Sequence, residues 1–154
     1  MSDPAQKAQN QLYTPEERER RDRSRWTLVQ GLLAPLQFFI FLVSLGLVLR
    51  FLATGEGFVA ASVSIIAKTI TLYTIMVTGA IWEREVFGCY LFAPAFFWED
   101  VVSFGVIALH TTYLICLLNG SLNEQSLLWL ALVAYAAYVI NAAQFLLKLR
   151  AAAS

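Results

Sequence analysis

Apolar residues along this chain gather into four long stretches, which polar or turn-forming residues separate. The stretches cover approximately residues 28–52, 59–82, 97–118 and 127–147. Each is close to the roughly 20 residues that an α-helix needs to cross about 30 Å of hydrocarbon. The pattern therefore predicts an all-α membrane protein, a four-transmembrane-helix bundle that forms one domain over residues 26–150.

The breaks between the stretches carry turn-forming residues. Thr54-Gly55-Glu56-Gly57 makes the first break, and Asn119-Gly120-Ser121 makes the third. Both are short, so consecutive helices should pack antiparallel. The second break, residues 83–94, is longer and carries several charged and aromatic residues.

Residues 1–25 form a polar N-terminal segment, which is expected to include a short cytoplasmic helix. Thr14 suits the N-cap, Pro15 suits the first helical position, and Glu17 completes a capping box. Opposite charges four residues apart support an exposed helix, and they occur here as Glu16–Arg20, Glu17–Arg21 and Glu19–Arg23. This polar start does not resemble a cleavable signal peptide.

Composition and charge agree with a lipid environment. Hydrophobic residues make up 58% of the chain and charged residues only 14%, whereas soluble domains have about 25% charged residues. The formal net charge of +0 predicts no nucleic-acid partner. Most Lys and Arg residues fall on one side of the expected bundle, so both termini are predicted to be cytoplasmic. Cys89 and Cys116 lie most of a membrane helix apart and are expected to be free thiols.

Polar residues inside the spans predict a polar bundle interior. Interhelical hydrogen bonding is the simpler role for the neutral ones, which are Gln30, Ser44, Ser64, Thr71 and Asn141. Ionisable groups within a span are costlier and suggest function. Lys68 is expected to pair with an ion or contact a ligand, with snorkelling toward the interface as the alternative. His110 is either a satisfied core histidine or a ligand or proton carrier.

Residues 82–100 hold the strongest candidate site. Four acids and one base stand there among many aromatic rings, at the expected cytoplasmic boundary. The acids are Glu83, Glu85, Glu99 and Asp100. A flat apolar ligand would need rings over its faces, and those available include Trp82, Tyr90 and Trp98. Partly desolvated carboxyl groups can keep a proton available near neutral pH. Alternatively, Glu83 and Glu85 only flank Arg84 as ion pairs.

This region also carries a family resemblance. The runs Leu72–Glu83 and Tyr90–Asp100 resemble the 2-vinyl bacteriochlorophyllide hydratases, also called chlorophyllide a 3-vinyl hydratases. Tyr13–Arg18 and Arg25–Gly31 with Ala34-Pro35 resemble them too, so the likeness covers nearly the whole chain. The resemblance implies a hydro-lyase that adds water to the C3 vinyl group of chlorophyllide a or a related chlorin. The product is the 3-(1-hydroxyethyl) pigment of bacteriochlorophyll synthesis.

The resemblance brings no established catalytic residues, so the roles are hypotheses from chemistry. Glu99 or Asp100 is the expected general acid, and Glu83 or Glu85 is the expected base for the attacking water. No cofactor and no metal site of the protein is expected, because Mg²⁺ arrives within the pigment.

Other residues are expected to bind the pigment. His110 is the candidate axial ligand to its Mg²⁺, although this ion prefers oxygen ligands. Arg84 or Arg25 is the candidate partner of its propionate. The rings of Trp82, Tyr90 and Trp98, together with Lys68, complete the expected substrate-binding set.

Two other functions remain open at this stage. One is a non-catalytic pigment carrier or assembly factor, and the other is a small transporter or quinone-binding subunit that uses Lys68. The expected location is the bacterial inner membrane, either cytoplasmic or intracytoplasmic and photosynthetic. Expected partners are the pigment and the lipid bilayer, while a homo-oligomer and contacts with other pigment-biosynthesis enzymes stay open.

Overall fold

The structure, a computed structural model, describes residues 12–153. In chain order its elements are α2 (Pro15–Arg23), α3 (Arg25–Thr54), α4 (Phe58–Phe87), the 3-10 helix η1 (Pro94–Phe96), α5 (Phe97–Asn119) and α6 (Glu124–Ala153). Four of these helices are long and apolar enough to cross a membrane, which confirms the predicted fold class. Residues 1–11 of the expected N-terminal segment lie outside the described residues.

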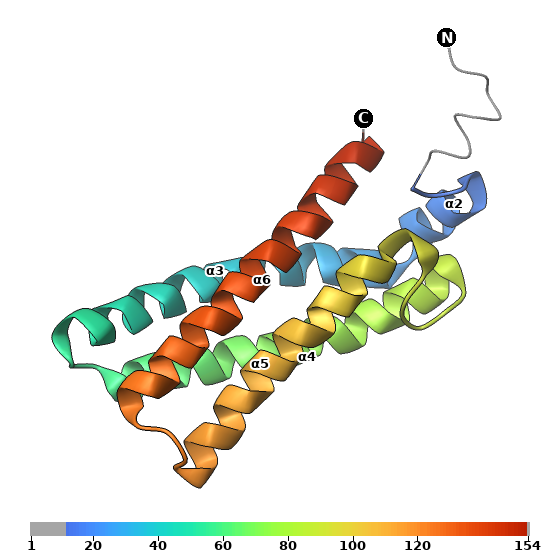
Figure 1. Ribbon diagram of the computed structural model, residues 1–154. Helices are drawn as coiled ribbons and strands as arrows, with labels where there is room; N and C mark the ends of the chain where they lie inside the picture. Colours follow the sequence, from blue (N-terminus) through green and yellow to red (C-terminus); the bar gives the residue numbers. More distant parts are fainter. Residues whose placement is uncertain (1–11, 154) are drawn as a thin grey trace.

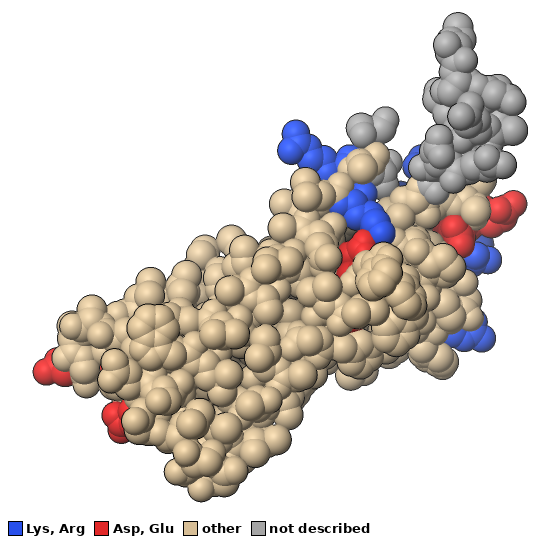
Figure 2. Space-filling view, in the orientation of Figure 1, with Lys and Arg blue, Asp and Glu red and all other residues tan. Residues whose placement is uncertain are grey.

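The four long helices form two hairpins that pack against each other. α3 packs mainly on α4, and α5 packs mainly on α6, with smaller contacts between the hairpins. Helix α2 and the C-terminal end of α6 lie at the same end of the bundle (Figure 1). Charged side chains gather at the two ends, and a broad uncharged band lies between them (Figure 2). This distribution suits a bundle whose middle is surrounded by lipid tails.

Glycines in the left-handed conformation end three of the long helices, as the turn signals suggested. Gly55 has a φ of 74° and Gly120 a φ of 70°, so the first and third breaks lie where they were predicted. The second span is longer than the apolar pattern indicated, because α4 continues through Glu83 and Glu85 to Phe87 and stops at Gly88. Good helix formers extend the helix past its apolar part until a glycine with a φ of 88° terminates it. Glu83 and Glu85 therefore stand on a helix and point in different directions.

The short N-terminal helix begins as its capping box predicts. Thr14 Oγ1 accepts from the Glu17 backbone N–H at 3.1 Å, and Glu17 Oε1 accepts from the Thr14 N–H at 2.9 Å. Of the three expected charge pairs, the described contacts include Glu19–Arg23 at 3.8 Å. Arg21 instead pairs with Asp22 at 2.9 Å.

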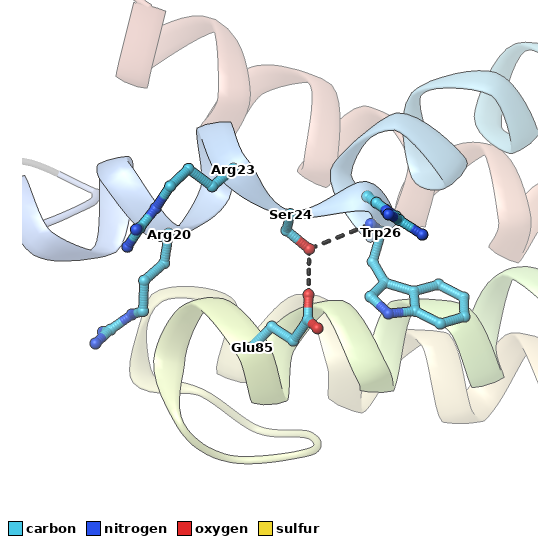
Figure 3. A pocket seen from close by; sticks show the side chains of 6 residues that line it. Arg20, Arg23, Ser24, Trp26 and Glu85 are labelled. Atoms are coloured by element: carbon cyan, nitrogen blue, oxygen red, sulfur yellow. Dashed lines mark hydrogen bonds between the residues drawn. The ribbon is translucent and has the colours of Figure 1, made fainter.

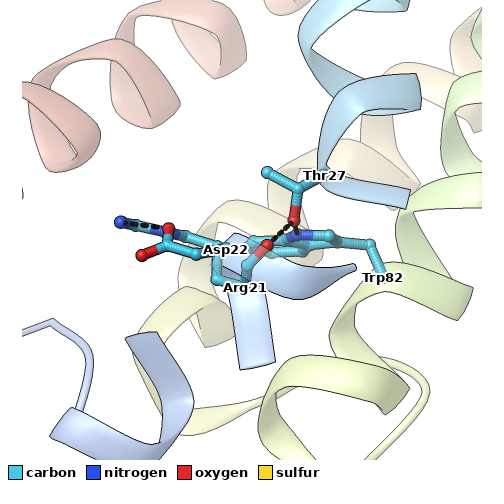
Figure 4. Close-up of polar contacts among 4 residues, drawn as sticks. All are labelled: Arg21, Asp22, Thr27 and Trp82. Carbon is cyan, nitrogen blue, oxygen red and sulfur yellow. Dashed lines mark hydrogen bonds and ion pairs between the residues drawn. The ribbon is translucent and has the colours of Figure 1, made fainter. Parts of the chain in front are cut away.

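Helix α2 is attached to the bundle through contacts with α3 and α4. Thr27 Oγ1 donates to the Arg21 carbonyl at 2.6 Å and accepts from Trp82 Nε1 at 2.8 Å (Figure 4). Tyr13 is buried and stacks on Phe87 with ring centroids 5.6 Å apart. Burial raises the pKa of the Tyr13 phenol. These contacts place α2 across the C-terminal turns of α4.

Hydrogen bonds between neutral polar side chains join the helices inside the bundle. Ser44 Oγ lies 2.8 Å from Ser64 Oγ and 2.6 Å from the Tyr135 hydroxyl, so one contact set joins three helices. Gln30 Nε2 donates to Thr78 Oγ1 at 2.6 Å. The predicted structural role is confirmed for these residues, whereas Thr71 bonds within α4, to the Ala67 carbonyl.

Candidate functional site

Three carboxyl groups from two helices come together at the end of the bundle where α2 lies. Glu83, near the C-terminus of α4, is only 3% exposed, and Glu99 and Asp100, in the first turn of α5, are each 5% exposed. The loop between α4 and α5 folds back so that the end of one helix meets the start of the next. We call Glu83, Glu99 and Asp100 the carboxyl cluster, and its burial is the feature that sequence alone could not show.

Glu99 is the member of the carboxyl cluster that has a cationic partner. Lys148, on α6, forms an ion pair with Glu99 Oε1 and also donates to the Ala95 carbonyl. Its ammonium lies 5.6 Å from the centroid of the Phe96 ring. Lys148 therefore holds α6, η1 and α5 together and compensates the charge of Glu99.

The backbone beside Glu99 is fixed by a second contact between α5 and α6. Asn141 Nδ2 donates to the Glu99 carbonyl at 2.9 Å, and Asn141 Oδ1 accepts from Ser103 Oγ at 2.8 Å. Ser103 Oγ also lies 2.9 Å from the same Glu99 carbonyl. The first turn of α5 is thus rigidly placed against α6, as a preorganised site requires.

Asp100 and Glu83 form the other part of the carboxyl cluster. The two carboxyl groups adjoin each other, and Asp100 Oδ2 accepts the Phe92 backbone N–H at 2.9 Å. Apart from the Asp100 carboxyl group, no described side chain or backbone N–H offers a hydrogen bond to either carboxyl oxygen of Glu83. A buried carboxyl group without a donor is costly, which indicates that this group keeps a proton or meets a ligand.

Glu85, the alternative base, lies apart from the carboxyl cluster. Its carboxylate accepts from Ser24 Oγ, and it lines a surface pocket of about 510 Å³ between α2, α3 and α4. Arg20, Arg23, Arg25 and Trp26 line the same pocket (Figure 3). Glu83 and Glu85 are two positions apart on a helix, so they face nearly opposite sides. The structure thus separates two acids that the sequence treated as equivalent, and it places Arg25 with Glu85.

The aromatic residues of this region divide into an inner and an outer group. Trp82 is half-buried and contacts Phe87 and Phe96, each with ring centroids 5.7 Å away. Trp98 and Tyr90 face outward, with 69% and 63% of their surface exposed. The guanidinium of Arg84 lies 5.9 Å from the centroid of the Tyr90 ring, and the described ion pairs do not link it to Glu83.

Lys68 and His110 form a separate polar centre deep in the bundle. Lys68 is fully buried, and its ammonium lies 3.5 Å from the Tyr138 ring centroid without a hydrogen-bond partner among the described residues. His110 Nδ1 lies 2.8 Å from the Val106 carbonyl, and its Nε2 likewise has no described partner. Snorkelling is therefore not how Lys68 is accommodated, and neither residue touches the carboxyl cluster in a described contact.

Sequence reasoning missed two residues of the site. In the sequence, Lys148 is only one of the positive charges on one side of the bundle, and Phe92 is only one of many aromatic rings. A basic residue directly after an apolar span could have suggested a pairing role for Lys148. No sequence signal marks Phe92, since its φ of 61° is unusual for a bulky residue and depends on the fold.

The fold and the carboxyl cluster define a four-span membrane protein with buried acids and aromatic rings at one end of its bundle. A family model described as "2-vinyl bacteriochlorophyllide hydratase" matches residues 13–151. The chain belongs to this family of pigment-biosynthesis enzymes, as the sequence resemblance predicted.

Two relatives carry the same name. The protein from Cereibacter sphaeroides is 69% identical over 141 residues, which cover 92% of this chain and 88% of the relative. The protein from Rhodobacter capsulatus is 66% identical over 149 residues, covering 97% of this chain and 85% of the relative. No solved structure matches this chain.

Proposed function

We propose that this protein adds water to the C3 vinyl group of a chlorophyllide or bacteriochlorophyllide pigment, with Glu83 and Asp100 as the acid–base pair. Family membership supports the reaction, and the adjoining buried carboxyl groups of these two residues support the assignment. The carrier alternative is not favoured, because the relatives are named as hydratases. The pigment is the substrate, and its Mg²⁺ enters with it.

The reaction needs one proton at the terminal vinyl carbon and one water at the carbon attached to the ring. Protonation of the terminal carbon breaks the π bond and leaves positive charge beside the macrocycle, which can delocalise it. Water then forms the new C–O bond and releases a proton. The sum is the vinyl group plus water, with no net oxidation, so the proposed mechanism needs no cofactor.

Glu83 and Asp100 fit this proton cycle as a pair. Two carboxyl groups side by side in a buried place do not both ionise readily, so one proton shared between them supplies the missing donor. In the proposed cycle the pair gives that proton to the vinyl carbon and takes one back from the water. The Phe92 N–H on Asp100 Oδ2 fixes the direction of the pair.

Glu99 has a different proposed role. Its carboxylate is engaged by the Lys148 ammonium, so we do not assign it the proton transfer to the vinyl group. A fixed carboxylate next to Asp100 instead stabilises the positive charge that develops on the pigment. Of the two residues expected as the acid, Glu99 and Asp100, we therefore propose Asp100.

The function is tested by supplying the purified full chain with chlorophyllide a and following its absorption. Loss of the vinyl group shortens the conjugated system, so the red band is expected to move to shorter wavelength. Mass spectrometry should show a gain of one water. Binding without a band shift would instead identify a carrier, and an absence of pigment binding would favour the transporter or quinone-binding alternative.

His110 is proposed to act in the bundle core rather than as an axial ligand of the reacting pigment. It follows Asp100 by ten residues, or about 15 Å along the helix, which exceeds the separation of a chlorin's metal from its vinyl group. We therefore expect His110→Ala to leave the pigment's affinity and kcat within about twofold of wild type, measured by fluorescence titration and the absorption assay. A tenfold loss of affinity with insertion intact would restore the axial-ligand role.

We also propose that the end of the bundle bearing α2 and the carboxyl cluster faces the cytoplasm of a photosynthetic bacterium. The supporting observation is the positive charge at this end, on α2 and at Lys148 and Arg150. A cysteine placed at position 16 or 150 should react with a membrane-impermeant label only from the cytoplasmic side. Labelling from the periplasm would reverse the orientation.

A further inference from the structure

An exposed group of stacked rings lies directly beside Asp100. Phe92 stacks on Phe104 with centroids 5.4 Å apart and an interplanar angle of 15°, and it also contacts Phe97 at 5.7 Å. Each of these three side chains keeps about two-fifths of its surface exposed. We call Phe92, Phe97 and Phe104 the aromatic face.

The spacing along α5 places the aromatic face around the acid. Phe97, Asp100 and Phe104 are three and four residues apart, so they share one side of the helix. Phe92 reaches them from the preceding loop, and its backbone N–H donates to Asp100 Oδ2 at 2.9 Å. A buried acid and a half-exposed ring are therefore joined through one backbone hydrogen bond.

The backbone of Phe92 is strained in the way that functional sites often are. A φ of 61° is the left-handed region, which a bulky residue adopts only when its surroundings impose it. Here the bond to Asp100 and the stack on Phe104 impose it. Displacing Phe92 would relieve the strain and release Oδ2 of Asp100 from the Phe92 N–H.

A cation stands at the water-side edge of the same loop. Arg84 is exposed at the end of α4, and its guanidinium lies near the ring of Tyr90, two residues before Phe92. An aromatic surface with a cation at its edge is complementary to an aromatic molecule that carries a carboxylate at one margin. The pigment acid has this shape and charge.

We propose that the pigment docks from the lipid, with its macrocycle flat on the aromatic face, its carboxylate at Arg84, and Phe92 displaced to admit the vinyl group to Asp100. This inference rests on the proposed reaction but places the substrate outside the helical bundle. It makes Phe92 a positioning residue, because its N–H orients Asp100 and its ring closes the site. Phe104 and Phe97 are then specificity determinants for a planar substrate.

Loss of a ring from the aromatic face is the direct test. Phe92→Leu and Phe104→Leu keep the side chains apolar but remove the stacking surface, so each is expected to raise the pigment's Kd about two- to tenfold. For Phe104→Leu, KM should rise while kcat stays near wild type. The control is Phe39→Leu, a more exposed ring on α3, which should change neither value. Wild-type Kd values for both variants would mean that the rings form only a membrane-interface belt and would overturn the proposal.

The proposed contact of Arg84 with the pigment's carboxylate is tested by comparing a charged ligand with an uncharged one. Arg84→Gln should weaken binding of the free pigment acid several-fold and leave binding of its methyl ester unchanged. Equal weakening of both ligands would contradict a carboxylate contact.

The position of the bound pigment separates docking on the face from docking inside the bundle. Fluorescence of stoichiometrically bound pigment in vesicles should be quenched by lipids that carry a nitroxide near the headgroup. A pigment enclosed by the four helices would escape quenching, and that result would overturn the proposal.

Pigment-binding titrations of ring variants that also carry Glu83→Gln separate failure of the docking proposal from failure of the acid assignment. If this variant still shifts the red band at wild-type rate, the acid assignment fails, while the Kd values of the ring variants still decide the docking proposal.

Discussion

Asp100→Asn is expected to lower kcat by about 10²–10⁴-fold, which is the usual contribution of a well-placed general acid or base. The amide keeps the size of the side chain and its acceptor for the Phe92 N–H, so the fold and pigment binding should persist. Glu83→Gln should cause a loss of similar size, because the two carboxyl groups act on one proton. The measurement is the initial rate of the band shift with saturating pigment.

The double variant sharpens this prediction. Residues that act as a unit are strongly non-additive, so Glu83→Gln with Asp100→Asn should be little slower than either change alone. The matched control is Glu85→Gln on the same helix, whose carboxylate bonds to Ser24 in the pocket beside α2, and it should stay within about twofold of wild type. Near-normal turnover in both single variants would remove the carboxyl pair from the mechanism.

Lys148→Met is expected to destabilise the folded bundle by about 1–3 kcal/mol. Removing one partner of a buried ion pair costs roughly 3–5 kcal/mol, and this value is reduced here because the Lys148 side chain is one-third exposed. The variant leaves the Glu99 carboxylate buried without its cation and the Ala95 carbonyl without its donor. Unfolding of the detergent-solubilised protein by a denaturing detergent measures the change.

A double-mutant cycle isolates the pair from general packing effects. Adding Glu99→Gln to Lys148→Met removes the uncompensated charge, so the double variant should be more stable than Lys148→Met alone. Lys148→Arg, which keeps the charge, should retain most of the stability. Strict additivity of the two single changes would show that the ion pair does not couple α6 to α5. In the same series Glu99→Gln should slow turnover less than Asp100→Asn does.

The chain's one-dimensional pattern was enough to establish the membrane fold. Four apolar stretches of spanning length, separated by glycine-bearing breaks, can satisfy their backbone hydrogen bonds in lipid only as helices, so the number and order of spans followed directly. The Thr14 capping box was equally readable, because capping depends on residues three positions apart in sequence. The end of α4 could not be predicted from the apolar pattern. The apolar stretch ends at Trp82, whereas the helix continues to Phe87 and is capped by Gly88.

The sequence also identified the family and indicated residues 82–100 as the candidate site, but it could not rank the acids. Glu83 and Glu85 look alike along the chain, yet only the packing of α4 against α5 and α2 turns one inward to Asp100 and the other outward to Ser24. The pairing of Glu99 with Lys148 joins residues 49 positions apart, and the hydrogen bond from the left-handed Phe92 to Asp100 forms only when the loop is closed. Local chemistry thus determined the helices, caps and turns, whereas contacts between distant residues decided which carboxyl groups are buried and which of them has a cationic partner.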